Sequence, residues 1–224
     1  MKSAVITGAN RGIGLCLAKQ LSEKGYQITA LCRQGSDELN QLSNTQIIDQ
    51  VELSEPHSIQ QACESISDRP IDLLINNAGR LRHIPLSIMD TQNIEEINTQ
   101  FHINALAPLL VTHHLKASLN PGAKVALITS RMGSIEDNQS GSHYAYRMSK
   151  AALNAAGKSL SIDLKSDRIA VAILHPGWIQ TDMTGHSGND TPENAARDLL
   201  ARIDALTLDQ TGTFWHANGE VLPW

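Results

Sequence analysis

Near its start the chain reads Ser3-Ala-Val-Ile-Thr-Gly-Ala-Asn-Arg-Gly-Ile-Gly14, an apolar run that passes directly into a turn with three glycines. The apolar run predicts a buried strand, and Ile13, Leu17 and Leu21 then recur at the four-residue steps of a helix. In such a unit one glycine permits a tight turn, one lets a phosphate approach the backbone, and one lets the helix pack against the strand. The free N–H groups of the helix N-terminus favour a pyrophosphate. The stretch therefore predicts a dinucleotide-binding unit, although a plain strand-to-helix turn would also account for it.

Six further apolar runs follow, and most of them are continuous rather than alternating, as expected for strands buried on both faces of a parallel sheet. They are Gln27–Cys32, Gln46–Val51, Asp72–Ile75, Lys124–Thr129, Ile169–Leu174 and Thr213–His216. Stretches with helical spacing lie between them, the longest being Ile94–Leu119 and Ala145–Leu164. This alternation predicts an α/β fold: one Rossmann-type domain over residues 1–224, a doubly wound parallel sheet of about seven strands with helices on both faces.

Composition excludes several other classes of protein. The 224 residues are 41% hydrophobic but only 4% aromatic, which predicts an aliphatic core. The formal net charge of −5 disfavours nucleic acid as a partner, and no apolar run approaches the roughly 18 residues of a membrane span. Three cysteines without CxxC spacing and a start without a signal peptide's apolar stretch lead us to expect a reduced, cytoplasmic protein.

The end of the second strand bears on which dinucleotide is bound. An acidic residue there would bind the 2′-hydroxyl of NAD, but the chain reads Leu31-Cys-Arg33-Gln, with no carboxylate before Asp37. Arg33, helped by Arg11 of the glycine turn, could instead pair with a 2′-phosphate. The two arginines favour NADP(H) over NAD(H), unless each is only a solvated surface charge.

Tyr146 and Lys150 are four residues apart, on one face of the expected helix 145–164. A phenol has an ordinary pKa of about 10, and a nearby ammonium would lower it, so the pair suits proton donation to a carbonyl that receives a hydride. Tyr144 is the competing candidate, but it points roughly 120° away from Lys150. Such pairs also arise by chance on amphipathic helices.

Two further polar residues belong to this hypothesis. Ser130 ends the strand Lys124–Thr129, where its hydroxyl would face the ligand crevice; it could equally be an ordinary turn serine. Asn104 falls inside the long helical stretch, either as a solvent-facing residue or as the mark of a local break that frees a carbonyl for a bound water.

Together these residues resemble the short-chain dehydrogenase/reductase family, over essentially the whole chain. The resemblance is carried by Thr7-Gly8-Ala9-Asn10-Arg11-Gly12-Ile13-Gly14, Asn76-Asn77-Ala78-Gly79, Asn104, Ser130, Tyr146-Arg-Met-Ser-Lys150 and Pro176-Gly177. The segments from Tyr144 to Asn154 and from His175 to Met183, and the ending Gly219–Trp224, are similar to the C-factor and sniffer-type carbonyl reductase branch.

The resemblance implies a role for each residue of a catalytic set. Tyr146 would be the general acid or base, Lys150 would bind the nicotinamide ribose and lower the pKa of Tyr146, Ser130 would orient the substrate carbonyl, and Asn104 would hold a water of a proton relay. The implied cofactor-binding residues are Gly8, Asn10, Arg11, Gly12, Ile13, Gly14, Arg33, Glu52, Leu53, Asn76, Ala78, Gly79, Tyr146, Lys150, Pro176, Gly177, Ile179 and Thr181.

Two departures from the family pattern stand out. Glu52, followed by Leu53, stands where the family usually has an aspartate that binds the adenine. The stretch from Ser130 to Tyr146 is also a few residues longer than in many members, which weakens the assignment of Ser130.

The sequence thus predicts an NADP(H)-dependent oxidoreductase that reduces an aldehyde or ketone, reversibly, with a small-molecule carbonyl or alcohol as substrate. The alternatives are a signalling protein of the C-factor type that binds the cofactor with little turnover, and a sugar-nucleotide epimerase, which usually needs a larger substrate region. Residues 184–192 form a candidate substrate lid. The family implies a homodimer or homotetramer. No metal site is expected, because the adjacent His113 and His114 point to different helix faces.

Overall fold

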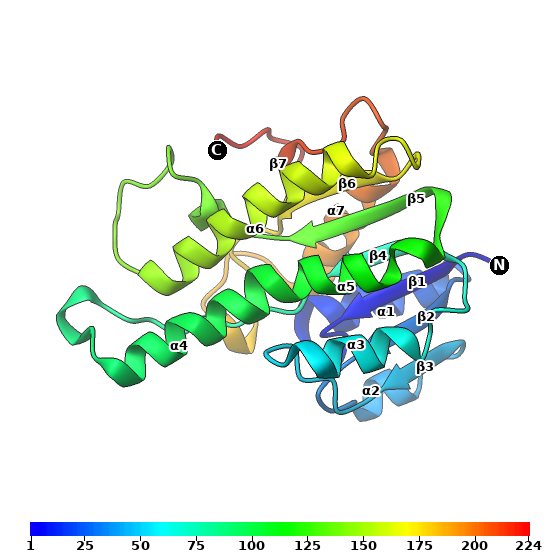
Figure 1. Ribbon diagram of the computed structural model, residues 1–224, viewed down its shortest axis with the longest axis horizontal. Helices are drawn as coiled ribbons and strands as arrows, with labels where there is room; N and C mark the ends of the chain where they lie inside the picture. Colours follow the sequence, from blue (N-terminus) through cyan, green and yellow to red (C-terminus); the bar gives the residue numbers. More distant parts are fainter.

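The computed structural model describes residues 1–224 as one domain built on a seven-stranded sheet. The order is β3-β2-β1-β4-β5-β6-β7 and every pairing is parallel (Figure 1). The strands are β1 Ser3–Thr7, β2 Gln27–Leu31, β3 Thr45–Ile48, β4 Ile71–Asn76, β5 Leu119–Ile128, β6 Ala170–His175 and β7 Phe214–His216. The predicted Rossmann-type sheet is therefore confirmed, since each expected apolar run lies within or overlaps a strand.

Helices cover both faces of the sheet and divide its core in two. The helices are α1 Gly12–Glu23, α2 Asp37–Asn40, α3 Pro56–Glu64, α4 Thr91–Phe101, α5 Ala107–Leu115, α6 Tyr144–Asp163 and α7 Pro192–Ala205. One aliphatic cluster joins α1 and α7 to the sheet, and the other joins α3, α5 and α6 to the opposite face (Figure 1). Burial on both faces explains why the strands read as continuous apolar runs.

The prediction of one continuous helix over Ile94–Leu119 is wrong. The structure has α4, then a π-helical turn over His102–Leu106, then α5, and Leu119 already belongs to β5, where it pairs with Ile71. The break falls at Asn104, one of the two alternatives that the sequence left open for this residue. Its side chain is fully buried and bonds to a neighbouring segment, so tertiary contacts stabilise the irregular turn.

The strand order reverses at β1, because β2 and β3 lie on one side of it and β4 to β7 on the other. In open α/β sheets, ligands bind at the carboxyl ends of the strands beside this switch point. The loops that follow β1, β4, β5 and β6 meet there, and each carries residues named above. This edge of the sheet is where the site is expected.

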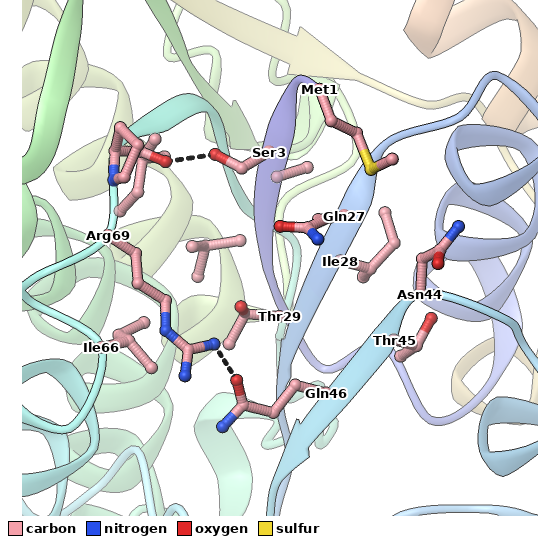
Figure 2. Close-up of a pocket in the computed structure, with 14 residues that line it drawn as sticks. Met1, Ser3, Gln27, Ile28, Thr29, Asn44, Thr45, Gln46, Ile66 and Arg69 are labelled. Atoms are coloured by element: carbon pink, nitrogen blue, oxygen red, sulfur yellow. Dashed lines mark hydrogen bonds between the residues drawn. The ribbon is translucent and has the colours of Figure 1, made fainter.

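A cavity of about 420 Å³ lies at the opposite edge, where β1, β2 and β3 begin (Figure 2). None of the predicted catalytic or cofactor-binding residues lines it; among its polar side chains, the Ser3 hydroxyl donates to the Pro70 carbonyl, and the Arg69 guanidinium donates to the Gln46 amide oxygen. The candidate site is therefore identified by the polar residues that meet at the carboxyl ends of the strands, and not by this cavity.

None of the helices combines the length and the hydrophobicity needed to cross a lipid bilayer.

Candidate active site

In the glycine turn after β1, the third glycine, Gly14, has no room for a side chain. Gly8 and Gly12 have φ of +66° and +53°, in the left-handed region that glycine adopts freely. A Cβ added to Gly14 would lie 2.2 Å from the Gly8 carbonyl oxygen and 2.5 Å from Nδ2 of Asn77. The first turn of α1 has no side-chain cap and no acidic residue. These features fit a pyrophosphate, because the backbone can approach closely and the helix offers unpaired N–H groups.

Asn77 holds this turn from the neighbouring strand. Its side-chain amide donates to the carbonyl oxygens of Thr7 and Gly8, each at 3.1 Å, while the Thr7 hydroxyl accepts from the backbone N–H of Asn77 and Ala78. Asn77 belongs to the motif Asn76-Asn77-Ala78-Gly79, but the family resemblance implied no role for it. Its position one residue beyond β4, at the switch point, was the signal that could have identified it.

Asn76 at the end of β4 and Ala78 after it have different surroundings. Asn76 is buried and donates to the Thr112 hydroxyl of α5 at 3.3 Å, so it joins β4 to a helix. Its Oδ1 is buried without a partner. Ala78 lies directly against the glycine turn, since a Cβ added to Gly8 would be 3.0 Å from its Cα. Asn76 thus steadies the sheet, and Ala78 borders the expected dinucleotide site.

The two arginines expected to bind a 2′-phosphate have different surroundings. Arg33 is exposed after β2, and its guanidinium makes no ion pair or side-chain hydrogen bond. Arg11 instead pairs with Asp182, with 2.8 Å between Nη1 and Oδ2. Arg33 is therefore unpaired at the end of β2, where the sequence predicts a 2′-phosphate contact, whereas Arg11 would have to exchange Asp182 for a phosphate.

Glu52 and Leu53 do not extend freely toward an adenine. The Glu52 carboxylate accepts from the backbone N–H and the hydroxyl of Ser54, at 3.3 and 3.0 Å. Leu53 packs against the apolar cluster on the α3 face. An adenine contact at this position would thus involve the backbone more than the Glu52 side chain.

Tyr146 and Lys150 lie together on the buried face of α6. Their exposed fractions are 7% and 3%, and Nζ of Lys150 is 5.7 Å from the centre of the Tyr146 ring. This Nζ donates to the Ile128 carbonyl oxygen of β5 at 2.9 Å, so the ammonium is anchored to the end of a strand. Tyr144 is 38% exposed on the same helix. The structure thus brings Tyr146, not Tyr144, to Lys150.

Burial controls the acidity of both groups. It raises the pKa of the Tyr146 phenol to about 12, and a hydrogen bond with Ser130 acts in the lowering direction. Burial also lowers the pKa of the Lys150 ammonium to about 7. Desolvation of the phenolate is the largest cause of the raised pKa of Tyr146, and the lowering of that pKa by Lys150, which the resemblance implies, stays a prediction. Tyr146 is therefore a protonated phenol near neutral pH.

Ser130 reaches Tyr146 because the turn after β5 is packed tightly against α6. It caps the 3₁₀ turn Arg131–Gly133 by accepting from the Met132 backbone N–H at 3.1 Å. A Cβ added to Gly133 would lie 2.7 Å from the Lys150 backbone. Close packing at this glycine holds the turn, and with it the Ser130 hydroxyl, beside the phenol.

Asn104 is fully committed to protein contacts. Its side chain accepts from the Arg80 backbone N–H and donates to the Arg80 carbonyl, both at 2.8 Å, and also donates to the Ser149 hydroxyl at 2.9 Å. A Cβ added to Gly79 would lie 3.4 Å from Oδ1 of Asn104 and 3.8 Å from Nζ of Lys150. The segment after β4 therefore borders both side chains.

The loop after β6 closes back on the glycine turn. Gly177 has φ of +104°, and Ile179 is buried beside it, while Pro176 precedes both. A Cβ added to Gly12 would lie 3.4 Å from the Thr181 methyl group. Thr181 thus contacts the first βα turn, and the two predicted ends of the cofactor site meet.

The candidate lid, residues 184–192, is held to its own base. Trp178 is 47% exposed, and its indole N–H donates to the Ser187 carbonyl at 2.7 Å. The backbone N–H of Gln180 donates to the Asp190 carbonyl at 2.9 Å. The segment is a packed loop beside Ile179, and its movement over a substrate stays a prediction.

Lys150 gives the fold a distinctive pH dependence, which Lys150→Met should remove. Because its folded pKa is near 7 and its unfolded pKa near 10.5, the unfolded chain binds the extra proton between these values. Stability of the wild type should therefore rise, relative to the variant, by on the order of a few kcal/mol between pH 7 and pH 10. Urea unfolding across this range measures it, and parallel stability curves would refute a buried, neutralised lysine.

Comparison with known protein families adds independent findings. The family model described as short chain dehydrogenase matches residues 2–192. A 1-hydroxy-2-glutathionyl-2-methyl-3-butene dehydrogenase of Rhodococcus sp. (strain AD45) is 34% identical over 230 residues, covering all of both chains. The C-signal protein of Myxococcus xanthus is 43% identical over 157 residues, which cover 69% of this chain and 93% of that protein.

Solved structures agree with these matches. The carbonyl reductase Sniffer of D. melanogaster superposes with a TM-score of 0.90 at 31% identity over the whole of both chains. An NADPH-bound carbonyl reductase from chicken fatty liver gives 0.88 at 29% identity, covering 100% of this chain and 99% of that one. The similarity thus extends over the entire sheet and the loops at its carboxyl edge.

Proposed function

Because the chain belongs to the short chain dehydrogenase family, we propose that it is an NADP(H)-dependent reductase of aldehydes or ketones. The single observation that carries the proposal is the buried group of Tyr146, Ser130 and Lys150 at the carboxyl end of β5. The carbonyl reductase structures that resemble the whole chain also support it. The matches confirm the resemblance to the C-factor and sniffer-type branch.

In this proposal the bound nicotinamide supplies a hydride to the substrate's carbonyl carbon. Oη of Tyr146 donates its proton to the carbonyl oxygen, and the Ser130 hydroxyl orients that oxygen toward the phenol. A phenol whose pKa is raised to about 12 keeps its proton at neutral pH, which suits the reducing direction. Lys150, with a pKa near 7, can supply the replacement proton under the same conditions.

The other proposed contacts follow the geometry of the carboxyl edge. The proposed catalytic residues are Asn104, Ser130, Tyr146 and Lys150. The proposed cofactor-binding residues are Gly8, Asn10, Arg11, Gly12, Ile13, Gly14, Arg33, Glu52, Leu53, Asn76, Ala78, Gly79, Tyr146, Lys150, Pro176, Gly177, Ile179 and Thr181. Among them, the side chains of Glu52 and Asn76 already have protein partners, and Leu53 packs against the apolar cluster on the α3 face.

Arg33→Asp should weaken NADPH binding about 10- to 100-fold and NADH binding far less. The free guanidinium of Arg33 can form charge-assisted hydrogen bonds with a 2′-phosphate, whereas an aspartate would repel that phosphate. Titration of each cofactor against both proteins measures the effect. Arg69→Asp, the same charge change at the opposite edge of the sheet, is the control. Equal weakening of both cofactors by Arg33→Asp would overturn the 2′-phosphate role.

A second candidate function is favoured by one specific observation, the 43% identity to the C-signal of Myxococcus xanthus. A signalling protein could retain the cofactor site with little turnover. Purified protein incubated with NADPH and a panel of aldehydes and ketones separates the two functions. Cofactor consumption matched by alcohol formation supports the reductase, while binding without turnover of any carbonyl supports the alternative.

The substrate class and assembly are proposed more broadly. The Rhodococcus relative is named as the dehydrogenase of a hydroxy compound, which supports a small-molecule alcohol or carbonyl substrate. The exposed Trp178 would border the pocket. A homodimer or homotetramer stays a prediction from the family, which light scattering in solution would test.

A further inference from the structure

Helix α4 buries polar side chains where an amphipathic helix would normally bury apolar ones. Glu96 and Gln100 of α4, and Asn104 of the π-helical turn that follows, are spaced at four-residue steps, with exposed fractions of 7%, 0% and 0%, whereas Ile94 is 49% exposed. Figure 1 shows that α4 projects beyond the carboxyl edge of the sheet, so its inner face does not lie over the strands. Burial of such groups is unfavourable unless each is hydrogen-bonded, which directs attention to their partners.

All three side chains bind one short segment, residues 80–82, in the loop after β4. Glu96 accepts from Nε and Nη2 of Arg80, both at 2.7 Å, and lies 3.8 Å from the Arg82 guanidinium. Gln100 accepts from the Arg82 backbone N–H at 3.3 Å and donates to its carbonyl at 3.1 Å. Asn104 makes the same pair of bonds with the backbone of Arg80, at 2.8 Å.

This arrangement specifies a register. Residues 80–82 are in neither a helix nor a strand, so their backbone groups depend on side chains for partners. Apolar contacts would also hold a loop against a helix, but they are not directional. Paired amide–peptide hydrogen bonds, together with a two-bond arginine–carboxylate contact, fix which loop residue faces which helix residue.

The segment held in this way touches the catalytic residues. Gly79 precedes it and borders both Asn104 and Lys150. Asn104 also donates to the Ser149 hydroxyl, which donates to the Tyr146 carbonyl at 2.8 Å. Displacement of residues 80–82 would therefore be transmitted to the π-helical turn and to the helix that carries Tyr146.

We propose that Glu96 and Gln100 are positioning residues, which hold residues 79–82 in register on α4 and thereby fix Asn104 and Lys150 for the reaction. The catalytic part of this inference rests on the proposed reductase function. Its structural part concerns the chain alone and can be measured without substrate. The two parts are therefore tested by separate readouts on the same variants.

The first readout is hydrogen–deuterium exchange of the protein without cofactor. Glu96→Gln removes the charge that binds Arg80, and the neighbouring Glu95→Gln is the matched control, since Glu95 is exposed and makes no ion pair. We expect exchange about tenfold faster both in residues 79–82 and in the turn 102–106 for Glu96→Gln. Glu95→Gln should exchange like the wild type.

The second readout is steady-state kinetics on the best carbonyl of the panel. Glu96→Gln and Gln100→Leu should lower kcat by about 10- to 100-fold with little change in KM, because misplacement of the catalytic group affects the transition state most. Asn98→Leu, on the exposed side of α4, is the control for Gln100→Leu. Arg80→Lys should retain more kcat than Arg80→Met, since it keeps the charge opposite Glu96.

The outcomes separate the inference from the function on which it rests. Faster exchange confined to residues 79–82, with the turn 102–106 and kcat unchanged, would overturn the positioning role. The role would equally fail if Glu96→Gln and Gln100→Leu matched their controls in both readouts. If the wild type reduced no carbonyl while Glu96→Gln still accelerated exchange in both segments, the reductase proposal would fail and the structural role of Glu96 would stand.

Discussion

Tyr146→Phe is expected to lower kcat for carbonyl reduction by about a thousandfold, while NADPH affinity stays within about threefold of the wild type. The change removes only Oη, because the phenyl ring keeps the shape that fills the buried position. Without the phenol, the proposed proton donor is lost, and a less well positioned group or water would have to protonate the developing alkoxide. Steady-state kinetics and a fluorescence titration with NADPH measure the two quantities.

Tyr144→Phe is the matched control for this experiment. Tyr144 lies on the same helix but is 38% exposed, so the loss of its hydroxyl should leave kcat unchanged. A Tyr146→Phe variant with wild-type kcat would assign the proton donor elsewhere. A Tyr144→Phe variant with the larger loss would show that the wrong tyrosine had been chosen.

Gly14→Ala is expected to weaken NADPH binding by about 100-fold and to lower the Tm. The added Cβ would lie 2.2 Å from the Gly8 carbonyl oxygen and 2.5 Å from Nδ2 of Asn77. Neither group can yield alone, since Gly8 donates to the Leu31 carbonyl at 2.9 Å and Asn77 bonds to the same turn. The start of α1 must therefore move away from β1, which displaces the N–H groups that would bind a pyrophosphate.

Gly25→Ala provides the control for Gly14→Ala. Gly25 has φ of +80° but open space around its missing Cβ, so alanine there introduces backbone strain without a collision. A modest stability loss of about 1 kcal/mol, with unchanged NADPH binding, is expected. If Gly14→Ala bound NADPH like the wild type, close packing at Gly14 would not be required for cofactor binding.

The fold could be predicted because its signals are local. Continuous apolar runs such as Lys124–Thr129 mark strands buried on both faces, and the glycines of residues 8–14 mark the first turn. The break at Asn104 was only one of two alternatives, because a buried amide stabilises it through contacts with Arg80, more than twenty residues away. The spacing of apolar residues along a helix cannot indicate a hydrogen bond to a residue so far away in the sequence.

The sequence predicts which residues of the candidate site lie together, but not their pKa values or ion pairs. Tyr146 and Lys150 lie together as their spacing on one helix face indicates. The four-residue spacing does not indicate that burial raises the pKa of Tyr146, because burial depends on how α6 packs. The pairing of Arg11 with Asp182 was likewise invisible, since these residues are brought together by the loop after β6.

The most direct test of the reductase proposal follows a label from the cofactor to the product. NADPH carrying two deuterium atoms at the reactive carbon of its nicotinamide is incubated with the wild type and the carbonyl panel, and the alcohol is examined by mass spectrometry. Under the reductase proposal we expect one deuterium on the former carbonyl carbon with the wild type, and about a thousandfold slower labelling with Tyr146→Phe. NADPH binding without label transfer to any carbonyl would contradict it and favour the signalling alternative.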